Sequence, residues 1–461
     1  MVRLFSHYFP VGTLLLVTMD AFCLLLADLL GLLVLNHAGI YEVTQVIPGA
    51  IAFVALMLTM SGALGLYSDH PSDDVWLFAR RLVIPLLIVL PVLHWVVYRL
   101  PEGGISVMAV GAALLFGFTG RLAIFSFSRA SASFTTRRVM VLGVGDDAMI
   151  VKETLEQSRI PGLHIVGFYS PYSDVTMMSS LPSNKVLMNT TSITDTVRQL
   201  NVNEIVIAMR ERRGGGLPLA ELLNCKLSGV QVTDFSSFFE NYKSRVRIDL
   251  LRESWFIFGD GFRQGRSRMF VKRTFDIVAS GILLILSLPV MLIAAIAVKL
   301  ESAGPIIYRQ SRVGLGGKTF DVLKFRSMFV DAECDGKPQW AQRGDLRVTR
   351  VGYFMRLTRI DELPQLMSVL SGQMSLVGPR PERPYFVEQI AEKVPFYAAR
   401  HSVKPGVTGW AQVRHHYGAS VEDASDKLEY DLFYVKNHTL FFDILILFYS
   451  VKVVLTAQGS R

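Results

Sequence analysis

Residues 272–299 read KRTFDIVASGILLILSLPVMLIAAIAVK, a continuous apolar run between cationic ends. Its length suits a membrane helix, but Pro289 removes one backbone donor in the middle and crowds the preceding turn, which predicts a sharp bend. Arg309 and Lys324 follow soon after the run, and the positive-inside rule therefore favours a re-entrant helix over 272–300 that returns to the face it entered. A kinked helix that crosses the membrane is the alternative.

The composition of the whole chain also indicates contact with lipid. Of 461 residues, 51% are hydrophobic and only 19% are charged, which is more apolar than an ordinary soluble protein of this length. The net charge of +8 is carried beside apolar segments and in Gly/Pro-rich loops. This distribution favours membrane lipids and phosphate-bearing substrates and argues against nucleic acid. Cys23, Cys225 and Cys334 are far apart and indicate neither a metal site nor disulfides.

The N-terminal part predicts a helical membrane domain. Four apolar stretches of nearly spanning length occur at 11–35, 46–66, 82–98 and 105–127. Arg80 and Arg81 flank the third stretch and Arg137 and Arg138 follow the fourth, whereas the opposite loops hold only Arg99. The positive-inside rule then places the N-terminus and everything after the fourth helix in the cytoplasm. The prediction is a multi-pass membrane protein whose soluble parts lie in the cytoplasm.

The middle of the chain predicts a soluble, doubly wound α/β sheet. Apolar strands are expected at 139–142, 164–168, 185–188 and 204–208. Gly143, Gly145 and Ala148 match the G-x-G-x-x-A form of a dinucleotide loop. Asp146 and Asp147 would repel a pyrophosphate there, and the chain lacks a Tyr-x-x-x-Lys pair. A structural or regulatory Rossmann-like domain is therefore favoured over a redox enzyme, and nucleotide binding stays open.

These patterns divide the chain into four parts. They are a four-helix transmembrane domain, a Rossmann-like nucleotide-binding-like domain, a linker and an α+β catalytic domain, at 1–130, 135–245, 246–270 and 271–461. Within the last part, strands near 306–310 and 320–325 predict a hairpin carrying Arg312, Lys324 and Arg326. The apolar segment 440–455 is interpreted as an amphipathic helix lying along the membrane.

The segment 356–365, RLTRIDELPQ, carries the candidate catalytic pair. Pro364 suits the first turn of a helix, so Asp361 and Glu362 are expected near a helix N-terminus, where the dipole helps to keep both ionised. Adjacent helical side chains point about 100° apart, so one carboxylate can attack phosphorus while the other holds Mg²⁺. A solvated helix start is the alternative for an isolated Asp-Glu pair.

Two constrained loops follow this pair. Residues 378–384, GPRPERP, form a Pro-fixed loop that presents Arg380 and Arg383, which suits phosphate recognition. Residues 404–410, KPGVTGW, form a second constrained loop, whose Trp410 is expected in the membrane interface or against a base.

Several strings together resemble one family. They are KRTFD, YRQSRVG, KFRSM, RIDELPQL, VGPRPERP and VKPGVTGWAQV, beginning at residues 272, 308, 324, 359, 377 and 403. With the order of the domains, they resemble the polyprenyl-phosphate hexose-1-phosphate transferases, or bacterial sugar transferases, which are large monotopic phosphoglycosyl transferases of exopolysaccharide, capsule or O-antigen synthesis.

The resemblance implies a ping-pong transfer from a UDP-sugar to undecaprenyl phosphate. Asp361 would be the nucleophile that forms a phospho-sugar intermediate, Glu362 would help to bind Mg²⁺, and Lys324, Arg356 and Arg380 fall on positions associated with phosphate binding. Glucose is the expected sugar, with galactose next, and a homodimer is expected.

Two residues depart from the family pattern. Leu288 replaces the usual Ser before Pro289, and Gln373 replaces an Asp whose supporting role is thereby in doubt.

The sequence leaves two other functions open. The loop at 143–148 and the four predicted spans also suit a membrane-attached nucleotide-sugar dehydratase or epimerase, but the absence of a Tyr-x-x-x-Lys pair argues against this function. A non-enzymatic scaffold for polysaccharide assembly is the other alternative.

Overall fold

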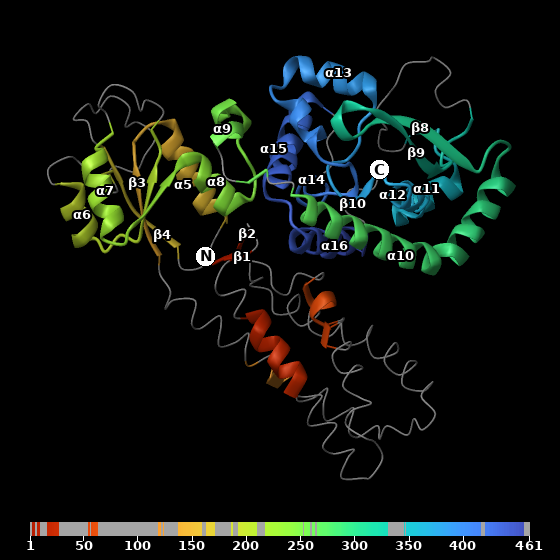
Figure 1. Cartoon of the computed structure of the whole chain (residues 1–461). Coiled ribbons are helices and arrows are strands. Elements are labelled where there is room, and N and C mark those ends of the chain that lie inside the picture. Colours follow the sequence, from red (N-terminus) through yellow and green to blue (C-terminus); the bar gives the residue numbers. More distant parts are fainter. Residues whose placement is uncertain are drawn as a thin grey trace, which may run out of the picture. The chain divides into compact units, whose positions relative to one another are not determined.

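The computed structural model (Figure 1) describes residues 2–4, 7–9, 16–26, 54–55, 57–62, 119–120, 123, 137–158, 163–170, 186–187, 192–209, 217–251, 253–258, 261–262, 265–330, 345, 347–415 and 420–455. The chain forms two compact units. The first contains Tyr8–Tyr242 and the second contains Lys243–Arg461, with short N-terminal pieces in each.

Only short parts of the predicted membrane domain are described. Strands β1 (Val2–Leu4) and β2 (His7–Phe9) pair with each other, and an apolar helix covers Leu16–Leu26. Asp20 on this helix is fully buried, as expected for an acid that faces protein instead of lipid. Most of the four predicted spans lie outside the described residues, so their number stays a prediction.

The first unit contains the predicted doubly wound sheet. Its elements are β3 (Arg137–Leu142), α5 (Asp146–Ser158), β4 (Leu163–Tyr169), β5 (Val186–Leu187), α6 (Ile193–Gln199), β6 (Glu204–Ile207), α7 (Leu219–Leu227), β7 (Gln231–Asp234) and α8 (Phe235–Lys243). The strands are all parallel in the order β5-β4-β3-β6-β7, which matches the first five strands of the Rossmann order 3-2-1-4-5-6. Strand β7 was not predicted, because it is short and has polar residues at both ends.

The second unit is built around one long helix, short strands and a helical layer. Its elements are η3 (Ile248–Leu250), α9 (Glu253–Phe258), α10 (Arg266–Glu301), β8 (Ile307–Val313), η4 (Leu315–Gly317), β9 (Thr319–Phe325), α11 (Arg350–Thr358), η5 (Ile360–Glu362), α12 (Gln365–Leu370), β10 (Ser375–Val377), α13 (Pro384–Lys393), η6 (Tyr397–Ser402), β11 (Gly406–Thr408), α14 (Trp410–Arg414), α15 (Val421–Asn437) and α16 (Leu440–Leu455). The hairpin β8–β9 is antiparallel as predicted, and β10 pairs in parallel with β11.

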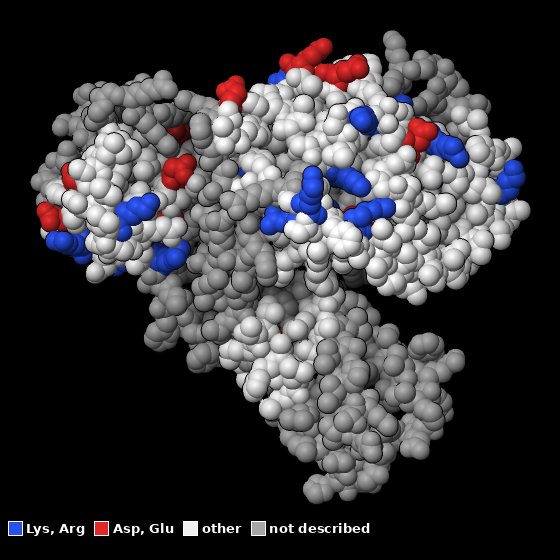
Figure 2. Space-filling view, in the orientation of Figure 1, with Lys and Arg blue, Asp and Glu red and all other residues white. Residues whose placement is uncertain are grey.

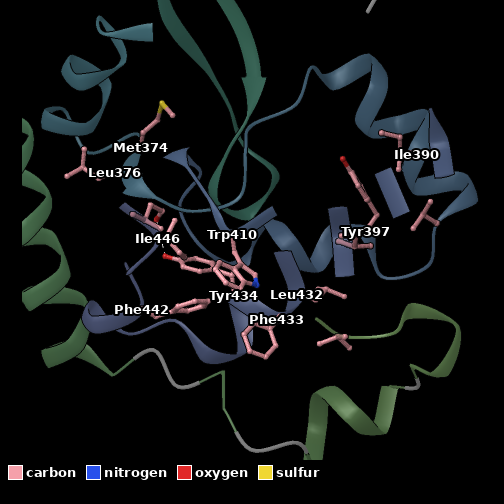
Figure 3. Close-up of a cluster of buried hydrophobic side chains, with 14 of the residues drawn as sticks. Met374, Leu376, Ile390, Tyr397, Trp410, Leu432, Phe433, Tyr434, Phe442 and Ile446 are labelled. Atoms are coloured by element: carbon pink, nitrogen blue, oxygen red, sulfur yellow. Dashed lines mark hydrogen bonds between the residues drawn. The ribbon is translucent and has the colours of Figure 1, made fainter. Parts of the chain in front are cut away.

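An aromatic cluster forms the core of this unit (Figure 3). Trp410, Tyr434 and Phe442 are almost completely buried and pack with aliphatic side chains from α12, α13 and α15. The Trp410 ring nitrogen donates to the Ser244 carbonyl oxygen over 2.8 Å. The expectation that Trp410 lies in the membrane interface or against a base is therefore wrong: the indole fills the core and its polar atom is satisfied there.

Helix α10 is unbroken over 36 residues, with Pro289 inside it. Figure 1 shows that the helix bends past its middle, as Pro289 predicts. Both ends are bonded to the same unit: near the start, Lys272 Nζ lies 2.6 Å from the Asp443 carboxylate, and at the end, the Glu301 carboxylate accepts from the Val351 amide over 3.1 Å. The bend and these two anchors together hold α10 as an arch on one body.

The middle of this arch presents apolar side chains to its surroundings. Its exposed hydrophobic residues include Ile282, Leu283, Ile285, Leu286, Leu292, Ile293 and Ile296, and the surface over α10 carries few charges (Figure 2). Among the described residues, α10 is the one helix long and apolar enough to cross a membrane. On α16, by contrast, Phe442 and Ile446 are fully buried while Phe441 and Val451 are exposed, so this helix has one packed face and one open face.

Candidate active site

Asp361 and Glu362 lie in a short 3₁₀ turn between two helices. Helix α11 ends where Arg359 adopts a left-handed backbone with φ of 61°, and η5 carries the two acids into α12. Pro364 directly precedes α12, where its fixed φ suits a helix start. The acids therefore lie just before a helix, as predicted, but six residues of α12 make only a weak dipole.

Three cations surround Glu362, which is almost fully buried. Its Oε1 accepts from Arg380 Nη2 over 2.8 Å and from Lys324 Nζ over 3.1 Å, and Arg359 Nη1 lies at 3.8 Å. Burial by itself raises the pKa of Glu362, but the positive charges of Arg380, Lys324 and Arg359 outweigh burial and hold this pKa well below its usual range. Glu362 is therefore a fixed negative charge.

Asp361 has a different environment. It is also buried, and its Oδ1 has no hydrogen-bond partner among the described residues. Burial and then the negative charge of Glu362 raise the pKa of Asp361 to about 6, against the opposing charges of Lys324 and Arg359. Side-chain cations thus hold Glu362 ionised, whereas desolvation shifts Asp361 the other way. A contribution of the helix dipole to the charge of the two acids stays a prediction.

The hairpin β8–β9 brings only part of its cationic set to the acids. Lys324 reaches Glu362, whereas Arg312 pairs with Glu382 at 3.3 Å and donates to the Pro381 carbonyl oxygen over 3.2 Å. Arg326 is buried and donates to the carbonyl oxygens of Ser302 and Ala303 over 2.7 and 2.9 Å. Arg326 therefore caps the C-terminus of α10, while Arg312 ties the hairpin to the 378–384 loop.

Close backbone contacts fix the loop that carries Arg380. A Cβ on Gly378 would lie 2.3 Å from the Lys404 carbonyl oxygen, so only glycine fits there. Behind the loop, Arg400 donates to the Arg380 carbonyl oxygen over 2.8 Å and pairs with Asp431 at 2.8 Å, and both members of this pair are buried. Arg400 and Asp431 therefore hold the backbone from which Arg380 reaches Glu362.

Sequence reasoning missed three of these residues. Arg359 stands inside the quoted RIDELPQL string, but nothing in the string shows that a left-handed backbone turns its side chain toward Glu362. Arg400 and Asp431 stand on separate elements, and no local spacing connects them.

Gln373, which departs from the family pattern, is exposed in the turn after α12, at the opposite end of that helix from the acids.

A cavity of about 1030 Å³ brings the predicted residues together. Its lining includes every residue that the sequence assigned to catalysis or to phosphate binding in this unit: Arg312, Lys324, Arg326, Arg356, Asp361, Glu362, Arg380 and Arg383. A space of this size, in which cations outnumber the acids Asp361, Glu362, Glu382 and Asp431, suits a phosphorylated organic substrate.

The two carboxylates fit one mode of magnesium binding. Among the described residues, no group of three or more His, Cys, Asp or Glu side chains could hold a metal ion, so these residues do not form a complete cage. Mg²⁺ is commonly held by one or two carboxylates together with substrate phosphates and water. The unpartnered Asp361 Oδ1 and the neighbouring Glu362 suit that arrangement.

In the first unit, the glycine-rich turn has a packing role. Gly143 has φ of 129°, and a Cβ there would lie 2.4 Å from the Ala208 carbonyl oxygen. Ala148 is buried at the start of α5, whereas Gly145 has open space beside it. Packing accounts for Gly143 and Ala148, and nucleotide binding by this turn stays a prediction.

Comparison with known proteins connects this site to one family. A family model described as "Bacterial sugar transferase" matches residues 267–457. The chain is 45% identical over 240 residues to a UDP-N-acetylgalactosamine-undecaprenyl-phosphate N-acetylgalactosaminephosphotransferase of Aeromonas hydrophila, covering 52% of this chain and 56% of that protein. It is 34% identical over 322 residues to a UDP-glucose:undecaprenyl-phosphate glucose-1-phosphate transferase of Klebsiella pneumoniae, covering 69% and 68%.

A third relative is named for transfer of galactose. The undecaprenyl-phosphate galactose phosphotransferase of Salmonella typhimurium is 32% identical over 339 residues, covering 70% of this chain and 69% of that protein. The matched segment 267–457 contains α10, the acidic pair and the cavity around it. This chain belongs to the bacterial sugar transferase family.

Proposed function

We propose that this chain is an undecaprenyl-phosphate glycosyl-1-phosphate transferase that moves a hexose-1-phosphate from a UDP-sugar to undecaprenyl phosphate. The relatives' names and the family support transfer of a sugar phosphate to this carrier. The site residues and the order of steps are our own inference from the geometry. The product, undecaprenyl-diphosphate-hexose, would begin assembly of an exopolysaccharide, capsule or O-antigen.

One observation carries the mechanism: the two adjacent acids differ in charge environment. Glu362 is bonded to Lys324 and Arg380, whereas a buried oxygen of Asp361 has no protein partner among the described residues. A carboxylate with an uncommitted oxygen is the better nucleophile of the two. Asp361 is therefore assigned the attack, and Glu362 the electrostatic support.

The transfer takes place in two displacements. First, an Asp361 oxygen attacks the phosphorus that bears the hexose, the bond from that phosphorus to the bridging oxygen breaks, and UMP leaves with the electron pair. Second, an oxygen of the carrier phosphate attacks the same phosphorus and Asp361 leaves as a carboxylate. Arg356, Arg359, Arg380 and Arg383 line the cavity beside the acids and neutralise the phosphates. When bound by Glu362 and the diphosphate, Mg²⁺ supplies further charge neutralisation.

Omitting the acceptor tests this sequence of steps. Purified enzyme mixed with a UDP-sugar labelled in the sugar phosphate should release one UMP per active site in a burst and retain the label on protein. Undecaprenyl phosphate added afterwards should discharge the label into lipid. UMP release that requires the acceptor from the outset, with no labelled protein, would contradict the covalent route.

The identity of the sugar is part of the proposal. The sequence favours glucose and then galactose, and the relatives' names add N-acetylgalactosamine. A parallel burst measurement with the three UDP-sugars therefore identifies the donor. The homodimer expected from the resemblance stays a prediction.

We also propose that α10 enters the membrane and returns to the side it left, which places the active site beside the cytoplasmic surface. A straight helix of 36 residues would be about 54 Å long, enough to separate its ends by a whole bilayer. Instead both ends are bonded to the unit that carries the acids. Arg266 and Arg268 are exposed at the start of α10, where cations would face anionic headgroups.

Cysteine labelling in intact cells tests this arrangement. In a chain without its three cysteines, cysteine is placed at the exposed positions Arg266, Leu300 and Lys318, the last marking the side of the active-site hairpin. We expect an impermeant maleimide to miss all three until the membrane is opened. Labelling of Arg266→Cys and Leu300→Cys from opposite sides would indicate a crossing helix.

A further inference from the structure

The cavity around the acidic pair also extends to the apolar arch of α10. Its lining includes Leu283, Leu286 and Ser287 of α10 as well as Asp361 and Glu362. Leu283 and Leu286 are 46% and 71% exposed, so the described part of the protein leaves much of their surface uncovered. One continuous space therefore connects the nucleophile with the part of the protein that faces lipid.

Helix α16 provides a second apolar wall. Leu447 and Val453 line the same cavity, while Ile446 on the packed face of this helix is fully buried. The side chains of Ser450 and Thr408 hydrogen-bond to each other over 2.6 Å, which joins α16 to β11 along the lining. The lining is thus apolar toward α10 and α16 and cationic toward Arg312, Arg380 and Arg383.

The inference rests on the proposed function, whose two substrates differ in polarity as the cationic and apolar parts of this lining do. A nucleotide sugar is polar throughout and gains nothing from contact with Leu283 or Leu286. A polyprenyl phosphate combines one anionic group with a long branched hydrocarbon, and its phosphate must reach Asp361 while most of its tail stays in the membrane. The first isoprene units must leave the bilayer for the phosphate to reach Asp361, and contact with Leu283 and Leu286 keeps them out of water, which is favourable by about 25 cal/mol per Å².

We propose that Leu283 and Leu286 of α10, with Leu447 and Val453 of α16, form a binding site for the first isoprene units of the acceptor. The site aligns the carrier phosphate with the phosphorylated Asp361 in the second displacement. It has no part in the first displacement, because the donor carries no hydrocarbon. The two half-reactions therefore respond differently to its removal.

The helix offers a matched control. Ile282 and Ile285 have the same three-residue spacing as Leu283 and Leu286, are 54% and 69% exposed, and do not line the cavity. The double variants Leu283→Ala/Leu286→Ala and Ile282→Ala/Ile285→Ala remove equal hydrocarbon from the arch. They should weaken contact with bulk lipid to the same extent, and only the first pair faces the acceptor.

The experiment measures the two half-reactions separately in full-length enzyme in nanodiscs. For Leu283→Ala/Leu286→Ala we expect the UMP burst to match wild type and the KM for undecaprenyl phosphate in the discharge step to rise about 10-fold, consistent with loss of several buried methylenes. For Ile282→Ala/Ile285→Ala we expect both values to stay within about 2-fold of wild type. A short polyprenyl phosphate of three isoprene units should show the same difference between the two variants.

Three outcomes would overturn the inference: an unchanged acceptor KM in Leu283→Ala/Leu286→Ala, an equal rise in both double variants, or a loss of the UMP burst confined to Leu283→Ala/Leu286→Ala. An equal rise would mean that the arch serves only as a membrane anchor. Failure of the proposed function itself is a separate result, because wild type would then give no UMP burst with any UDP-sugar.

Discussion

Replacing Asp361 by Asn is expected to abolish sugar-phosphate transfer, with a loss on the order of 10⁴-fold or more, as is typical when a covalent nucleophile is removed. The amide cannot form the mixed anhydride with phosphorus, so neither UMP release nor labelling of the protein should be seen. A radiometric assay of UMP and lipid product measures both. Asp321→Asn, at an exposed position on β9, is the matched control and should keep wild-type activity.

The same substitution is expected to stabilise the folded protein. The folded state raises the pKa of Asp361 from 3.8 to about 6, and burial is the main cause. The folded state therefore binds this proton more tightly than the unfolded state, and wild-type stability falls as pH rises from about 4 to about 6. Above that range the cost is constant, and below pH 4 it vanishes. Asp361→Asn should unfold at a higher temperature than wild type at pH 7.5, with little difference at pH 4.

These two results separate a catalytic aspartate from a structural one. Inactive Asp361→Asn that is less stable than wild type at pH 7.5 would mean that the ionised carboxylate supports the fold. Activity within about 10-fold of wild type would remove Asp361 from the mechanism, since a nucleophile contributes far more than that.

Replacing Glu362 by Gln is expected to lower the rate of UMP release on the order of 10²- to 10³-fold, the usual loss when one preorganised electrostatic group is removed. The fixed charge of Glu362 holds Lys324 and Arg380 at 3.1 and 2.8 Å. The neutral amide leaves these cations to repel one another and removes one proposed magnesium ligand. The Mg²⁺ concentration for half-maximal activity should therefore rise in Glu362→Gln.

A Mg²⁺ titration of the UMP burst checks this second result. Glu388→Gln, at an exposed position on α13, is the matched control. Asp361→Asn should also be titrated with Mg²⁺, with the unfolding temperature as the measurement, because this variant reports ion binding without turnover. A Glu362→Gln enzyme with the wild-type rate and Mg²⁺ response would assign the pair's electrostatic role to other groups.

Secondary structure can be predicted from local sequence, whereas the contacts between the site residues cannot. Spans, strands and a Pro-induced bend are local: a run of apolar residues or a proline acts on its own segment. The parallel sheet of the first unit and the hairpin β8–β9 were predicted on this basis, and the structure shows both. Strand β7 was missed because its four residues carry too little pattern.

Charge at the site depends on long-range contacts. Asp361 and Glu362 are neighbours in the chain, but their contacts differ. Glu362 accepts hydrogen bonds from Lys324 on β9 and from Arg380 in the loop after β10, whereas Asp361 Oδ1 has no hydrogen-bond partner among the described residues. Trp410 shows the same limit: beside a predicted membrane surface an indole suits the interface, but in the folded chain it fills the core.

The amino-acid sequence by itself determined the apolar arch with its proline, the doubly wound sheet, the acidic pair and the cationic loops, because each is encoded by residues close together in the chain. Only the tertiary structure decided which acid is neutralised, which arginine caps a helix and which leucines face the cavity. Those properties depend on desolvation and on charges brought from distant segments, and both arise only when the chain has folded.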